Sequence, residues 1–480
     1  MSSPPYVTVV GLEVHIQLLT HAKIFSGDAN RYGDTPNTNV GVITLAHPGT
    51  LPKFNRRVLE HAVRLGIACG SEISMHQVFD RKNYFYPDLP KGYQLTQDKT
   101  PVCRGGQIGL VLKDGASRMI SLHKIHMEED AGKSMHLEGR NESAVDYNRA
   151  GVPLLELVTH PVLHSGEEAA LFLSEVRKLV QFLGICDGNM EEGSLRCDAN
   201  VSVMPEGSRV LGKKVEIKNM NSIRHVQRAV DYEASRQTEI LQQGGEVISE
   251  TRTYHEEHGK TYSMRMKEDL NDYRYFPDPD LTPLELTKDW IDEIRKSMPA
   301  LPNQLREKFI TEYGLPAYDA DVLTESKEMA AYFEALCKEI RHYKSASNWL
   351  MGPVKSLMNE HQLTTFDVPP ARMAALISLV EEGKVSFTAA SQKLFPELVR
   401  TEELPMDIAV RLDLLQNRDR DAIEQLVKEV IHEFPLKVEE YHSGKKGIVS
   451  MLMGEVMKRG KGKLDPRLAN ECIIRKLNES

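Results

Sequence analysis

The chain has few cysteines, and none has a cysteine neighbour at metal-binding spacing. Six occur among 480 residues, at Cys69, Cys103, Cys186, Cys197, Cys337 and Cys472. Because no two of them form a Cys-x-x-Cys pair, the sequence predicts no zinc knuckle built from local cysteines. Scattered cysteines are typical of a reducing compartment, in which disulfides are rare.

Long apolar runs are also missing. No stretch approaches the roughly 18 apolar residues of a membrane span, and residues 1–6 lack the basic and apolar regions of a signal peptide. Together with the cysteine pattern, this predicts a cytoplasmic protein. The net charge of −9 excludes a globally basic nucleic-acid binder but leaves room for a local basic patch.

Length and pattern predict two or three domains of the α+β class. Residues 1–160 are punctuated by glycine, proline and asparagine, which predicts mostly strand and loop. A capping box at Ser165 and a terminating Gly184 predict one helix, and a second is expected from about Ser222 to Gln243. Strands are predicted at residues 195–203 and 213–219.

Prolines between positions 277 and 302 mark a boundary, beyond which the pattern is helical almost to the end. We predict an antiparallel-sheet domain at 1–295, an all-α helical domain at 296–405 and a small α-helical tail domain at 406–480. The tail contains four clustered cations, Lys458, Arg459, Lys461 and Lys463. These cations suit phosphate contact, and the alternative is an ordinary solvated surface.

Four short segments alternate apolar with ionisable residues, so each predicts a strand with one polar face. Carboxylates, a histidine and cations on such a face are what a site for metal and phosphate needs, although a solvated sheet surface remains the alternative. The polar-face residues are Glu13, His15, Gln17, Lys124, His126, Glu128, Arg196, Asp198, Asn200, Glu216 and Lys218. The aromatic, proline-rich segment 79–94 lacks both periods and predicts an ordered loop, either packed or in contact with substrate.

Several of these segments together carry a family resemblance that extends over nearly the whole chain. The segments are Val10–His15, Phe79–Gln94, Glu128–Lys133, Asp146–Leu154, Glu191–Asn200, Glu216–Asn221, Asp272–Pro277 and the tail from Gly454 onward. They closely resemble the B subunit of the aspartyl/glutamyl-tRNA(Asn/Gln) amidotransferase.

The resemblance implies a ligase subunit whose catalytic domain, an antiparallel-sheet cradle, is similar to glutamine synthetase. With ATP and Mg²⁺ it would phosphorylate the side-chain carboxylate of Glu-tRNA(Gln), Asp-tRNA(Asn) or both. Ammonia from a separate amidase (A) subunit would arrive through a channel and displace the phosphate. A small C subunit would complete a heterotrimer, and the helical and tail domains would hold the tRNA.

The resemblance also implies roles for individual residues. Candidate Mg²⁺ ligands are Glu13, His15, Glu128 and Glu216, with Asp198 and Glu129 as possible further ligands. Candidate catalytic residues are Glu128, with Arg196, Lys218 and Asn219 for phosphate contact. Lys82, Tyr84 and Lys91 are expected along the ammonia route, and Lys458, Arg459, Lys461 and Lys463 on the tRNA.

The chain departs from its bacterial relatives in one loop. Many of them carry a four-cysteine zinc cluster within segments here written 24–28 and 39–44, whereas this chain has no cysteine before Cys69. No structural zinc is expected, and packing and turns must hold residues 24–52. Two alternatives stay open: a non-catalytic tRNA-binding scaffold, and a metal-dependent hydrolase whose sheet face activates water.

Overall fold

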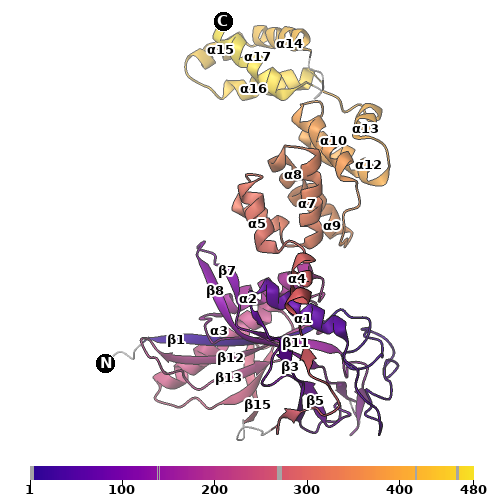
Figure 1. Ribbon diagram of the computed structural model, residues 1–480. Helices are drawn as coiled ribbons and strands as arrows, with labels where there is room; N and C mark the ends of the chain where they lie inside the picture. The colour runs from indigo at the N-terminus through magenta and orange to yellow at the C-terminus, as the bar shows by residue number, and fades with distance from the viewer. Residues whose placement is uncertain are drawn as a thin grey trace. The chain divides into compact units, whose positions relative to one another are not determined.

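The computed structural model describes residues 5–137, 139, 141–266, 273–416, 419–460 and 464–479. The chain forms two compact units, residues 1–302 and 303–480 (Figure 1). The first unit contains a large, mainly antiparallel sheet, and the second is helical. This confirms the predicted order of a sheet region followed by a helical region.

The large sheet has ten strands, in the order β15-β14-β13-β12-β1-β11-β8-β6-β2 with β7 paired to β8. All pairs are antiparallel except β13 with β14. The strands are β1 (Tyr6–Gln17), β2 (Glu72–Ile73), β6 (Cys103–Arg104), β7 (Gln107–Val111), β8 (Ser117–Glu129), β11 (Pro153–Thr159), β12 (Leu195–Pro205), β13 (Val215–Lys218), β14 (Glu250–His255) and β15 (Lys260–Met266).

Three small sheets accompany it. Their orders are β16-β4-β5, β10-β9 and β17-β3. Their strands are β3 (His76–Gln77), β4 (Asp80–Asn83), β5 (Tyr93–Thr96), β9 (Lys133–His136), β10 (Ser143–Asp146), β16 (Phe276–Pro277) and β17 (Leu284–Glu285). The expected loop 79–94 therefore contains two strands. Sequence periodicity missed them because each is four residues long, and β16, the third strand of their sheet, lies almost 200 residues further along the chain.

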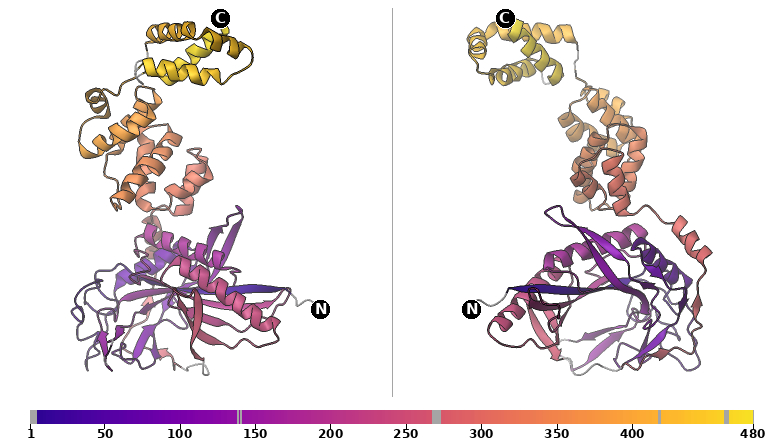
Figure 2. Two further views of the ribbon diagram at one scale, coloured as in Figure 1. Left: turned by 180° about the vertical axis from the view of Figure 1, so that it is seen from behind. Right: turned by 60° about the vertical axis from the view of Figure 1, so that its left-hand side comes forward.

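Helices pack on the apolar face of the large sheet (Figure 2). Leu12, Val14 and Ile16 of β1 are fully buried in this core together with α2 (Gly166–Leu183) and α3 (Ile223–Gln242). Both helices begin and end within a residue of the predicted bounds. The Ser165 hydroxyl accepts the Glu168 N–H at 3.1 Å, and Gly184 ends α2 at φ 66°. Burial on this face leaves the opposite face for the polar side chains.

Two helices of the sheet unit were not predicted. α1 (Arg56–Ala68) lies within the region expected to be strand and loop. Its signal is nonetheless in the sequence: Asn55 Oδ1 accepts the Arg57 N–H at 3.0 Å, and Val58, Ala62 and Leu65 recur at helical spacing and are fully buried. α4 (Lys288–Lys296) completes the helices described in this unit.

The second unit consists of helices, two of them interrupted by π-helical turns at Leu350–Val354 and Ala390–Leu394. The helices are α5 (Pro302–Thr311), α6 (Ala317–Leu323), α7 (Lys327–Glu339), α8 (Tyr343–Trp349), α9 (Lys355–Glu360), α10 (Pro370–Glu381), α11 (Phe387–Ala389), α12 (Phe395–Arg400), α13 (Pro405–Arg411), α14 (Arg420–Glu433), α15 (Pro435–His442), α16 (Ile448–Arg459) and α17 (Pro466–Glu479).

Helices α14 to α17 share one apolar core, which includes Val427, Leu452 and Ile473. The division of the helical region at residue 405, like the three domain bounds as a whole, stays a prediction. In the part of the chain that the structure describes, no helix is long and apolar enough to cross a membrane.

Candidate active site

Strand register brings the ionisable side chains together on the polar face of the large sheet. In β1, Glu13 lies opposite Asp198 of β12, and His15 lies between Arg196 of β12 and Glu156 of β11. Directly opposed residues of an antiparallel pair point to the same face. Two groups of potential metal ligands result.

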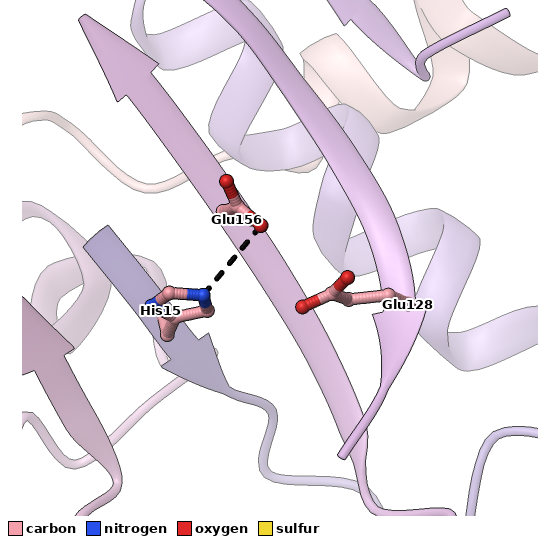
Figure 3. Close-up of side chains that lie close together, drawn as sticks. All are labelled: His15, Glu128 and Glu156. Carbon is pink, nitrogen blue, oxygen red and sulfur yellow. Dashed lines mark ion pairs between the residues drawn. The ribbon is translucent and has the colours of Figure 1, made fainter. Parts of the chain in front are cut away.

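The first group consists of His15, Glu128 and Glu156, whose ligand atoms lie within 4.8 Å of one another. Figure 3 shows the three side chains pointing toward a common space from β1, β8 and β11. His15 Nε2 lies 3.5 Å from Glu156 Oε2. Burial alone would raise the pKa of Glu156, but the neighbouring His126 and His15 outweigh burial and hold that pKa well below its usual value. The carboxylate is therefore ionised, with His126 Nε2 at 3.3 Å and His15 as its partners.

Glu156 was not among the predicted ligands. It stands alone as the ionisable residue in the apolar strand Pro153–Thr159. A solitary carboxylate in an otherwise apolar strand was the available signal, because burying a charge is costly unless a partner or a metal compensates it.

The second group consists of Glu13, Asp198 and Glu216, again with ligand atoms within 4.8 Å. Burial, followed by the charges of Glu156, Glu216 and Asp198, raises the pKa of Glu13 despite a 2.8 Å hydrogen bond from Asn200 Nδ2. Three crowded carboxylates repel one another, and a divalent cation would remove that repulsion. The group thus has the chemistry of a Mg²⁺ site.

Cations lie beside both groups. Lys218 Nζ donates to Asp198 at 2.6 Å and lies 3.2 Å from Glu216 Oε1. Arg196 donates to Asp130 Oδ2 at 2.6 Å, and the Gln17 amide donates to the same oxygen at 2.8 Å. Asp130 was not predicted as a site residue, although it directly follows the Glu128-Glu129 pair.

Asn219 occupies the left-handed backbone region at φ 62°, which is uncommon for a residue other than glycine. Its side-chain amide donates to Thr253 Oγ1 at 3.0 Å. This bond links the end of β13 to β14 immediately after Lys218. In the structure, Asn219 therefore fixes the turn that follows Lys218.

Glu129 lies outside both ligand groups. Its carboxylate accepts from Lys91 Nζ at 2.6 Å and from the Leu95 N–H at 2.9 Å. Lys91 and Glu129 line a small cavity together with Phe25, Ser26 and Thr44. Elsewhere in this region, Lys82 Nζ lies 5.9 Å from the Tyr84 ring and 4.9 Å from the Tyr273 ring.

Hydrogen bonds to one carboxylate join the two segments of the loop in which relatives are expected to bind zinc. Asp28 Oδ2 accepts from Thr44 Oγ1 at 2.6 Å, from the Gly41 N–H at 2.9 Å and from Ser26 Oγ at 3.0 Å. Burial would raise the pKa of Asp28, but these donors outweigh it and lower the pKa. Turns and hydrogen bonds hold this part of the loop, as expected.

The structure describes two of the four predicted tRNA-binding cations of the tail. Lys458 and Arg459 end α16. Arg459 forms ion pairs with Glu433 and, at 3.4 Å, with Glu455. Lys461 and Lys463 lie outside the described residues.

An antiparallel sheet with paired carboxylate groups, followed along the chain by a helical unit, agrees with the family matches. Residues 8–292 match the family model described as the GatB/GatE catalytic domain, and residues 331–477 match the model described as the GatB domain. The chain belongs to the family formed by the B subunit of aspartyl/glutamyl-tRNA(Asn/Gln) amidotransferase.

Individual relatives agree along the full length. Proteins named as the B subunit of aspartyl/glutamyl-tRNA(Asn/Gln) amidotransferase from Geotalea uraniireducens and from Thermoanaerobacter sp. strain X514 are both 45% identical to this chain. The first alignment covers 98% of this chain and 99% of the relative, and the second covers 99% and 100%. The relative of that name from Pelodictyon phaeoclathratiforme is 46% identical over 98% of this chain and 99% of its own.

Proposed function

We propose that this chain is the subunit that activates and amidates the side-chain carboxylate of Glu-tRNA(Gln), Asp-tRNA(Asn) or both, using ATP. The observation that carries the proposal is the pair of carboxylate groups on one sheet face, with Arg196 and Lys218 beside them. Family membership supports the choice of substrate.

The chemistry explains why such a face is needed. A carboxylate is a poor electrophile, and phosphorylation gives it a good leaving group. Phosphoryl transfer depends on positioning and on neutralising phosphate oxygens more than on covalent catalysis. Three carboxylates in one group and two carboxylates with a histidine in the other fit Mg²⁺, which would supply much of that neutralisation. Arg196 and Lys218 would bind phosphate oxygens, and Asn219 would keep Lys218 in place.

We further propose that the sheet unit resembles the catalytic fold of glutamine synthetase. The large antiparallel sheet, with its carboxylates on one face, supports that comparison. A covered reaction space would protect the acyl phosphate from water.

The nitrogen would come from a partner. We propose a heterotrimer with an amidase (A) subunit and a small C subunit, in which ammonia passes Lys82, Tyr84 and Lys91. The cavity beside the Lys91–Glu129 ion pair supports a passage there. The tail, including Lys458 and Arg459, would contact the tRNA backbone through its cations.

The decisive experiment is an amidation assay. The purified complex is incubated with each mischarged tRNA, with and without ATP, and both amide and released phosphate are measured. Glu13→Gln and Glu216→Gln should abolish ATP-dependent phosphate release while tRNA binding survives. Glu257→Gln, an exposed turn residue, is the matched control. Normal amide formation by the first two variants with ammonia supplied would refute the metal assignment, and activity without ATP would favour a hydrolase.

A further inference from the structure

A row of cations continues the polar face beyond the first ligand group. Alternation along β8 places Lys124 on the same face as Glu128. Glu13 of β1 lies opposite Val158 of β11, and Val158 lies opposite Lys124 of β8. On its other side, Lys124 lies opposite Arg104 of β6. At about 4.8 Å between neighbouring strands, the Lys124 backbone lies about 10 Å from that of Glu13, and the Arg104 backbone about 14 Å.

Among the residues that the structure describes, neither cation has an acidic ion-pair partner. Like charges directly opposite one another destabilise a sheet. Glu72 of β2 lies opposite Arg104, yet among the described residues no acidic group comes within ion-pair distance of Arg104 or Lys124. The Arg104 guanidinium instead donates to the backbone carbonyl of Lys99. The sheet thus retains an unfavourable pair that an anion would relieve.

Two exposed histidines lie beside Lys124. The exposed rings of His123 and His160 pack with their centroids 5.3 Å apart. Burial, followed by the charges of His160, Lys124 and Arg104, lowers the pKa of His123. The lowered pKa keeps the His123 ring neutral at neutral pH, so the positive charge in this region belongs to Lys124 and Arg104.

We propose that Arg104 and Lys124 bind the phosphates next to the aminoacylated 3′ end of the tRNA. This rests on the proposed function, because the carboxylate to be activated must then lie at the two ligand groups. The aminoacyl group and the terminal ribose separate that carboxylate from the first phosphate. When extended, they span about 10–14 Å, which is the distance across two to three strands of the sheet. Phosphate contacts position RNA without reading its sequence, which suits an end that all tRNAs share.

The phosphates of ATP are a poorer match for this row. The transferred phosphoryl group must lie at the ligand groups, where Lys218 and Arg196 already provide cations. Arg104 is three strands away from Glu13 across the sheet. The row and the ligand groups therefore serve different parts of the bound substrates.

The test uses the full amidotransferase complex with Arg104→Gln/Lys124→Gln in this chain. Arg209→Gln/Lys288→Gln, which removes two exposed cations from a loop and from the start of α4, is the matched control. Initial rates of amide formation, with ammonium chloride as nitrogen source, are measured against charged tRNA and against ATP at several salt concentrations. Binding of charged tRNA is measured in parallel.

For the double variant, we expect the KM and Kd for charged tRNA to rise about tenfold at physiological salt, and the salt slope of binding to fall by about 1.4. The KM for ATP should stay within twofold, and the control should match wild type. The thermal midpoint should not fall, because the substitution removes a like-charge pair.

Three results would overturn the inference: an unchanged KM and Kd for charged tRNA, an increase confined to the KM for ATP, or a lower thermal midpoint with an unchanged salt slope. A wild-type complex that forms no amide would instead refute the proposed function. In that case the binding measurement still tests whether Arg104 and Lys124 bind the tRNA. Equal tRNA affinities of the wild type and the double variant would overturn the inference.

Discussion

Replacing Asp130 by asparagine removes one charge from the residue that holds Arg196, with almost no change in side-chain size. Asp130 is 6% exposed. Its Oδ2 accepts from Arg196 at 2.6 Å and from Gln17 at 2.8 Å, and Arg149 Nε lies 3.8 Å away. Asparagine has nearly the same shape as aspartate, so this substitution tests the charge of the side chain alone.

The expected loss of stability follows from these contacts. Removing one partner of a buried ion pair costs about 3–5 kcal/mol. Asparagine can still accept a hydrogen bond from Arg196 or Gln17, so we expect about 2–3 kcal/mol, in the range for hydrogen bonds to charged groups. A change of this size should lower the thermal midpoint of the sheet unit by about 5 °C or more.

The loss should depend on pH in a defined direction. Burial would raise the pKa of Asp130, but the charges of Arg196 and Arg149 outweigh it and lower that pKa. The stabilisation is therefore fully present above the unfolded pKa of about 3.9 and disappears as pH falls through the lower folded value. The difference in midpoint between wild type and Asp130→Asn should be largest near neutrality and shrink in acid.

The same substitution should affect catalysis. A guanidinium that is no longer fixed would misplace the phosphate contact, and we expect kcat for amide formation to fall about 10- to 100-fold while tRNA binding is retained. Asp292→Asn, an exposed carboxylate of α4 that is 62% exposed, is the control. A variant with wild-type midpoint, wild-type pH response and wild-type kcat would refute the role of Asp130.

Four further predictions concern other parts of the chain. Glu156→Gln should reduce ATP-dependent phosphate release about 100-fold, because the first ligand group loses a carboxylate whose lowered pKa keeps it ionised, and added Mg²⁺ should restore part of the rate. Asp28→Ala removes the acceptor of three hydrogen bonds and should cost about 1–3 kcal/mol in a thermal melt; metal analysis of the wild type should find no stoichiometric zinc, and a bound equivalent would contradict this. Truncation after residue 405 should weaken tRNA binding and flatten its salt dependence, and unchanged affinity would dismiss the tail hypothesis.

The alternation of residues predicted much of the polar face. Glu13, His15 and Glu128 could be assigned to the polar side of their strands because strand side chains alternate with a period of two. In β1 the burial follows that period, whereas the last five residues of β8 are all buried. The capped helices α2 and α3 were equally readable, because Ser165, Gly184 and Ser222 signal their ends locally. Local signals thus predicted these helices and the polar side of these strands.

Partners distant in sequence could not be predicted in this way. Glu156 belongs with His15 only because β11 lies beside β1, and Asp130 meets Arg196 across 66 residues of sequence. Strand β4 pairs with β16, almost 200 residues later. Periodicity predicts on which face of the sheet a residue lies, but not which residue lies beside it on the next strand. The two ligand groups can therefore be recognised only from the strand register.

At the end of β8, two consecutive carboxylates have different partners. Glu128 points toward the first ligand group, while the next residue, Glu129, pairs with Lys91 at the small cavity. Ammonia arriving at Glu129 would have to pass the end of β8 to reach the carboxylate at Glu128, which accepts from Thr96 Oγ1 at 3.3 Å. Asp130 directly follows that end and accepts a hydrogen bond from Arg196. Under the proposed function, the residue that orients the phosphate contact would therefore also border the entry of the nucleophile.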